Sequence, residues 1–127
     1  MRGNDVPDGF PDDLKKAQAE LRRARAAYRA LCESLPWSVE PAAGWPGAEH
    51  PHTHEITAGR KDSPGYTPEQ AVREKELLDR VRELSIAVST HPYWDTVERG
   101  PKRVEERMRL KNHPAVLALL DDAAPAA

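Results

Sequence analysis

Apolar residues recur at alternating spacings of three and four between residues 11 and 35, and this repeat constrains the fold more than any other feature. Its positions are occupied by Leu14, Ala17, Leu21, Ala24, Tyr28, Leu31 and Leu35, which we call the heptad seam. Only an α-helix brings positions with this spacing onto one side, so the repeat predicts a helix over 11–35 with a buried seam. Small residues at 17 and 24 permit close approach by another helix.

A second long helix is predicted over 68–90. The stretch Thr67-Pro68-Glu69-Gln70 is typical of a capping box with proline at the first helical position. Apolar residues then follow at helical spacing. Because the two helices have similar lengths, we expect them to pack as an antiparallel hairpin, although the long connection between them also permits a parallel pair.

The connection, residues 36–67, contains five Pro and four Gly, which argues against a long regular element. It also contains Trp37 and Trp45, which a disordered linker has little reason to carry. We therefore expect an ordered, aromatic-bearing loop whose aromatic side chains dock on the helices, with a short strand at 53–57.

Two shorter helices are expected after the second long one, at 101–111 and 115–120, with proline near the start of each. The apolar run at 115–120 is also compatible with a strand, but the proline before it and its Ala and Leu content favour a helix. The predicted fold is therefore all-α: the long helical hairpin with its loop and a C-terminal helical extension. We predict a single helical domain over 11–120, a flexible arm at 1–10 and a flexible tail at 121–127.

Composition bounds the possible functions. The net charge of −2 gives no global bias toward nucleic acid or anionic membranes. Leu, Ile, Val and Phe together number 22 of 127 residues, so we expect part of the stability to come from a partner such as a second copy. The single cysteine, Cys32, and the lack of a leader or a spanning segment predict a cytoplasmic protein without membrane contact.

His50, His52 and His54, followed by Glu55, form the most chemically suggestive cluster. In an extended segment alternate residues share a face, so the three imidazoles can converge on a metal such as zinc. Sequential histidines in a polar loop usually bind metal only weakly, and we favour that interpretation. We therefore predict no metal site. A small metal-binding protein that uses the cluster at 50–54 is kept as the third functional hypothesis.

A basic ridge is predicted on the helix at 101–111, where Arg103, Arg107 and Lys111 recur at spacing four. Such a ridge can contact phosphates, which makes an accessory nucleic-acid-associated factor the second hypothesis. A solvated helix face is the simpler interpretation, because Glu105 and Glu106 weaken the field and the following element is apolar.

No catalytic motif or phosphate-binding glycine loop occurs, so we predict that the protein is not an enzyme and uses no cofactor. Cys32 is expected to be a semi-buried apolar residue, and His91 and His113, each followed by proline, are expected to cap or pack. The aromatic residues are expected to fill a thin helical core. The alternative is that they line a groove for a ligand or peptide.

Four stretches resemble a pattern in small helical proteins of high-GC Gram-positive bacteria of the Streptomyces type. They are residues 35–37 (Leu-Pro-Trp), 62–67 (Asp-Ser-Pro-Gly-Tyr-Thr), 90–94 (Thr-His-Pro-Tyr-Trp) and 107–111 (Arg-Met-Arg-Leu-Lys). The resemblance covers most of residues 14–112. It implies no activity and no site residue, because no activity is assigned to those proteins.

The leading hypothesis is a non-enzymatic interaction or adaptor protein that binds a protein partner, possibly as a homodimer, through the heptad seam. The predicted partner-binding residues are Leu14, Ala17, Leu21, Ala24, Tyr28 and Leu31. Under this hypothesis Ala24→Glu breaks the contact by burying an unpaired charge.

Overall fold

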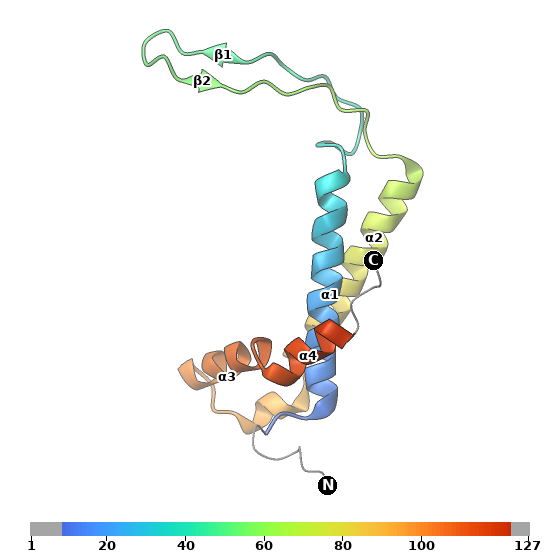
Figure 1. Cartoon of the computed structure of the whole chain (residues 1–127), viewed down its shortest axis with the longest axis vertical. Coiled ribbons are helices and arrows are strands. Elements are labelled where there is room, and N and C mark those ends of the chain that lie inside the picture. Colours follow the sequence, from blue (N-terminus) through green and yellow to red (C-terminus); the bar gives the residue numbers. More distant parts are fainter. Residues whose placement is uncertain (1–8, 123–127) are drawn as a thin grey trace. The chain divides into compact units, whose positions relative to one another are not determined.

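The computed structural model describes residues 9–122, whose contacts divide into two units. We call residues 9–28 with 77–122 the helical unit, and residues 29–76 the ribbon unit. In chain order the elements are α1 (Asp12–Ser34), β1 (Ala48–Glu49), β2 (Ile56–Thr57), α2 (Pro68–Ser89), the 3-10 helix η2 (Pro92–Thr96), α3 (Pro101–Lys111) and α4 (Pro114–Asp122) (Figure 1). Helices dominate the described residues, which confirms the all-α class.

The two long helices begin and end within one residue of the predicted positions. The capping box forms at the start of α2. The Gln70 N–H donates to the Thr67 hydroxyl at 3.1 Å, and the Thr67 N–H donates to the Gln70 side-chain oxygen at 2.9 Å. These two bonds satisfy backbone donors that a helix start otherwise leaves unpaired, and therefore fix where α2 begins.

Within the helical unit α1 and α2 run antiparallel. A guanidinium nitrogen of Arg80 lies 3.7 Å from a carboxylate oxygen of Glu20. His91, just past the end of α2, lies 3.1 Å from the carboxylate oxygens of Asp13 at the start of α1. Early residues of α1 therefore meet late residues of α2, which confirms the predicted hairpin.

The apolar core lies in the helical unit and draws on all of its helices. The buried apolar residues are Phe10, Leu14, Ala19, Leu21, Ala24, Leu84, Val88, Trp94, Leu110 and Val116. The Trp94 indole N–H donates to the Val88 carbonyl at 2.6 Å, which ties η2 to the end of α2. Phe10 stacks edge to face on Tyr93 and Trp94, so it is a core residue and not part of a flexible arm as predicted.

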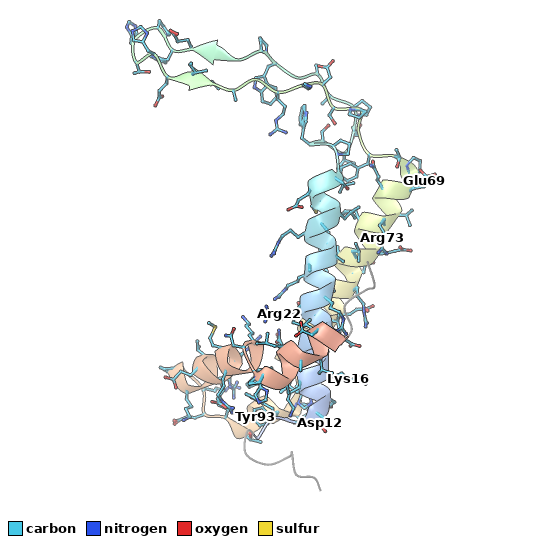
Figure 2. All side chains as sticks on the ribbon, viewed as in Figure 1. Asp12, Lys16, Arg22, Glu69, Arg73 and Tyr93 are labelled. Carbon is cyan, nitrogen blue, oxygen red and sulfur yellow. The ribbon has the colours of Figure 1, made fainter. Side chains whose placement is uncertain are left out.

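Arginines of α1 hold the C-terminal helices in place. Arg22, labelled on α1 in Figure 2, donates to the Lys111 carbonyl at 2.8 Å. Arg23 donates to the Leu119 carbonyl at 3.4 Å. Both carbonyls lie near helix ends, where the last carbonyls have no partner within the helix. The two arginines therefore serve as side-chain caps for α3 and α4.

The ribbon unit contains an antiparallel two-stranded ribbon, residues 37–66, in which β1 and β2 lie side by side (Figure 1). One register runs along it and pairs Ala42 with Ser63, Trp45 with Arg60, Ala48 with Thr57 and Glu49 with Ile56. The predicted strand at 53–57 is therefore partly right, since β2 covers its last two residues. The remainder of the expected loop is ordered by pairing between its two halves.

Glycines bring the two sides of this ribbon unusually close together. A Cβ on Gly44 would collide with the carbonyl oxygen of Arg60, and one on Gly59 would lie 2.6 Å from the Gly47 nitrogen. No other residue fits where backbones approach this closely. We call the stretch around Gly47 and Gly59 the glycine waist.

No helix within residues 9–122 combines the length and apolar character needed to cross a membrane. Most of the predicted arm at 1–10 and tail at 121–127 lies outside the described residues. Of the part that is described, α4 continues through Asp122, two residues beyond the predicted end of the last helix.

Candidate interaction surface

The heptad seam is already covered within a single chain. Leu14, Leu21 and Ala24 are buried in the core of the helical unit, and Ala17 packs against that core. Tyr28 and Leu31 are half-buried. A contact with a second copy through the buried members would require the fold to open, so the partner-binding surface expected from the repeat is replaced by intrachain packing.

The predicted basic ridge is also engaged within the fold. One guanidinium nitrogen of Arg103 donates to the carbonyls of Trp94 at 2.7 Å and Val97 at 2.8 Å. The Arg107 guanidinium lies 5.7 Å from the centre of a Trp94 ring. Lys111 is half-buried and its carbonyl accepts the Arg22 bond. Arg103 and Arg107 therefore hold η2, and the three residues do not form a free phosphate-binding ridge.

The histidine cluster forms the turn that joins β1 to β2. The Nδ1 atom of His50 accepts the backbone N–H groups of His52 and Thr53, each at 3.2 Å. His54 has a left-handed backbone with φ of 60°, and its Nδ1 lies 3.4 Å from a Glu49 carboxylate oxygen. Across residues 9–122 no three His, Cys, Asp or Glu side chains are placed to hold a metal ion. The bonds to His50 order the turn.

The histidines that precede proline act as caps, as expected. His91 Nδ1 accepts the Tyr93 N–H at 3.0 Å, and His113 Nδ1 accepts the Ala115 N–H at 3.0 Å. Because Nδ1 of His91 accepts, its Nε2 carries the hydrogen that is donated to Asp13. This bond holds the pKa of the Asp13 carboxyl below its ordinary value. Cys32 is exposed and not semi-buried as expected.

A shallow depression of about 310 Å³ lies between the first turn of α1 and α4. Its lining is mostly apolar, and Lys16 and Asp12 stand at its α1 side (Figure 2). The buried Lys15 also lines it, but its ammonium already lies 3.4 Å from an Asp12 carboxylate oxygen. The depression therefore brings together the Lys15–Asp12 ion pair, the Lys16 side chain and the apolar side chains of Ala115, Ala118 and Leu119.

The ribbon unit differs from the helical unit because it buries no apolar side chain. Every residue from 29 to 76 is described, and only Ser63 and Gly65 are buried. Leu31 and Leu35, at the α1 end, are half-buried. An ordered unit of this size without a core cannot offset its own loss of chain entropy through burial.

The two tryptophans of the ribbon pack on each other at its surface. Their ring centres are 5.6 Å apart in an edge-to-face arrangement, and the Arg60 guanidinium lies 5.2 Å from the Trp37 ring centre. The Trp37 indole N–H donates to the Lys61 carbonyl at 2.8 Å. We call Trp37, Trp45 and Arg60 the ribbon aromatic cluster. Within the ribbon unit the two tryptophans pack on each other and on the opposite side of the ribbon, and their docking on the helices stays a prediction.

The cluster is paired across the ribbon yet exposed. Trp37 is 39% and Trp45 is 50% exposed, and the backbones of Trp45 and Arg60 exchange two hydrogen bonds of 2.8 Å. Tryptophan and arginine are the residue types that most often dominate the energy of protein interfaces. The sequence contained a usable signal for this surface, namely glycines and prolines that alternate with tryptophans between two well-capped helices.

A protein-family profile described as a domain of unknown function, DUF8825, matches residues 13–113. The chain belongs to this family. The match spans both units, so the ribbon and the helices are part of the same family domain. No curated protein and no solved structure matches the chain significantly. The bacterial group suggested by the short sequence motifs stays a prediction.

Proposed function

We propose that this chain is a non-enzymatic protein–protein interaction protein that binds its partner through the ribbon aromatic cluster. The observation that carries the proposal is an ordered 29–76 unit with no buried apolar side chain and two exposed, mutually packed tryptophans. Covering such a surface with a partner supplies the burial that the unit lacks on its own.

The geometry supports this surface over the heptad seam. The seam is used by the chain's own core, whereas the two tryptophans of the ribbon cluster remain exposed. The non-enzymatic part of the proposal is supported by the capping roles of His91 and His113.

A cytoplasmic location is part of the proposal. A single exposed cysteine suits a reducing compartment, because an exposed thiol is reactive where disulfides form. The proposed partner is therefore another protein of the cell interior.

Site-specific photo-crosslinking in the native cell tests the proposal. A photoreactive amino acid replaces Val39 on the ribbon in one strain and Ile86 on α2 in another, because both side chains are 62% exposed. We expect protein adducts from position 39 and few from position 86. Equal adducts from both positions, or none from position 39, would contradict the proposal.

A further inference from the structure

We infer that a row of cationic side chains on α1 binds the phosphate backbone of a double-stranded nucleic acid. The row comprises Arg22, Arg25 and Arg29 of α1 together with Lys111 of α3, and we call it the α1 basic row. It shares no residue with the ribbon aromatic cluster, so it is a second surface beyond the proposed function. Although the whole chain carries a net charge of −2, residues 21–30 contain four arginines and no Asp or Glu.

The three arginines share one face of α1. They follow one another at spacings of three and four, and residues so spaced are neighbours on a helix surface. All three side chains are exposed. At 1.5 Å per residue, the arginines extend about 10 Å along the helix. Arg23, the fourth arginine of this stretch, donates instead to the Leu119 carbonyl of α4.

A hydrogen bond of Arg22 brings the fourth cation to the row. Its Nη1 atom donates to the Lys111 carbonyl at 2.8 Å, so the side chain of Lys111 begins beside Arg22. A guanidinium has five N–H donors, which leaves others for a phosphate after this bond is made. The ammonium of Lys111 is carried on a flexible four-carbon stem that can turn toward the same phosphate.

No carboxylate forms an ion pair with these four cations within residues 9–122. Glu20 is engaged by Arg80 at 3.7 Å. Glu33, one turn beyond Arg29, and Asp121 of α4 form no ion pair with a described residue. Even with both of these carboxylates counted against it, the row keeps a net charge of +2. By contrast, other arginines of the fold have a carboxylate oxygen at 2.8–3.9 Å, namely Arg73, Arg80, Arg82 and Arg109.

The neighbours of the row favour a nucleic acid over an acidic protein. On α1 the exposed neighbours of the arginines are Ala26 and Ala30, and no large apolar side chain of α1 is exposed. The centre of a protein interface is usually apolar and rich in aromatic side chains, whereas a phosphate backbone requires neither.

A duplex also matches the row better in charge density. It presents one negative charge per about 1.7 Å of its axis, so roughly six phosphates of the two strands fall within the length of the row. An extended acidic peptide has one residue per about 3.4 Å, and alternate side chains point away from the row.

The row fits a double strand better than a single strand. Single strands are held largely by stacking of their bases on exposed aromatic side chains. Tyr28, the aromatic residue of α1, is half-buried in the heptad seam instead. Contacts to phosphates carry no sequence information, so we expect binding that does not depend on base sequence.

Fluorescence anisotropy of the full chain with a short DNA duplex, and with an RNA duplex of equal length, tests the inference. We expect the logarithm of the binding constant to fall with the logarithm of salt concentration with a slope of about −3 to −4, because each phosphate contact contributes about −0.9. Arg25→Gln and Arg29→Gln should each weaken binding about fivefold or more and make the slope shallower by about one. Binding to either duplex supports the inference, and the tighter complex names the source of the phosphates.

Arg99→Gln is the matched control, because it removes the same charge from an exposed position outside the row. It should bind as the parent does, and circular dichroism should show the parent's helicity in all three variants. Arg22 is left unchanged because it caps α3.

Three results would overturn the inference: a parent that binds neither duplex at low salt, row variants that bind like the parent, or an equal loss in Arg99→Gln. Poly-L-glutamate bound as tightly as the duplexes would also overturn it, and would assign the row to an acidic protein.

Discussion

Replacing Arg103 by methionine should destabilise the helical unit strongly, because this residue ties α3 to η2. Its guanidinium makes two hydrogen bonds to carbonyls, at 2.7 and 2.8 Å, and each bond to a charged group contributes about 1.5–3 kcal/mol. In the variant, the Trp94 carbonyl still accepts the Val97 N–H at 3.0 Å. The Val97 carbonyl loses the bond that it accepts from Arg103.

A partial gain offsets this loss. The Nε atom of Arg103 is buried without a hydrogen-bond partner, so methionine removes a desolvation cost of about 1–3 kcal/mol. With the middle of each range, the net destabilisation is about 2.5 kcal/mol. For a cooperative unit of this size, that lowers the melting temperature by roughly 10–20 °C.

Thermal melting followed by circular dichroism measures this effect. Arg99→Met removes a charge from an exposed position and should change stability by less than about 0.5 kcal/mol. If Arg103→Met instead melted like the parent but lost salt-dependent binding to duplex DNA, the structural role of Arg103 would be refuted and the nucleic-acid hypothesis supported.

Three further predictions concern the two units separately. Gly44→Ala places a methyl group against the Arg60 carbonyl, so it should disorder the ribbon and weaken its near-UV tryptophan signal while the helical unit melts as before; an unchanged signal would contradict the close approach. Ala24→Glu buries an unpaired charge in the core, so it should destabilise folding by about 3 kcal/mol or more in chemical denaturation, and a variant as stable as the parent would exclude the intrachain seam. The His91 bond lowers the folded-state pKa of Asp13, so its stabilising contribution is present above the ordinary pKa and is lost as the pH falls through the lowered value. The difference in melting temperature between the parent and Asp13→Asn should therefore shrink below about pH 4, and a difference that grows with acidity would contradict this sign.

Local signals explain why the long helices could be predicted. The heptad seam and the Thr67–Gln70 capping box act through residues three or four apart, so their geometry is contained in the sequence. The same locality limits the interpretation. The repeat shows that a face of α1 is buried but not what covers it, and here the chain's own α2, η2, α3 and α4 supply the other core residues.

The ribbon and the basic ridge could not be predicted in this way. The ribbon depends on contacts between residues about 15 apart, such as Gly44 against the Arg60 backbone, which no local periodicity reveals. Spacing four in α3 marks one helix face, but an arginine on that face can bind a phosphate or cap a carbonyl equally well. Only the position of η2 shows that Arg103 and Arg107 face inward.

Hydrogen exchange, measured residue by residue on the isolated chain, tests most directly whether the helical unit carries the core and the ribbon requires a partner. The account predicts slow exchange in the core segments of α1, α2 and α3. It predicts fast exchange at 42–63 in the absence of a partner. Ribbon amides as protected as those of α1 would contradict the account.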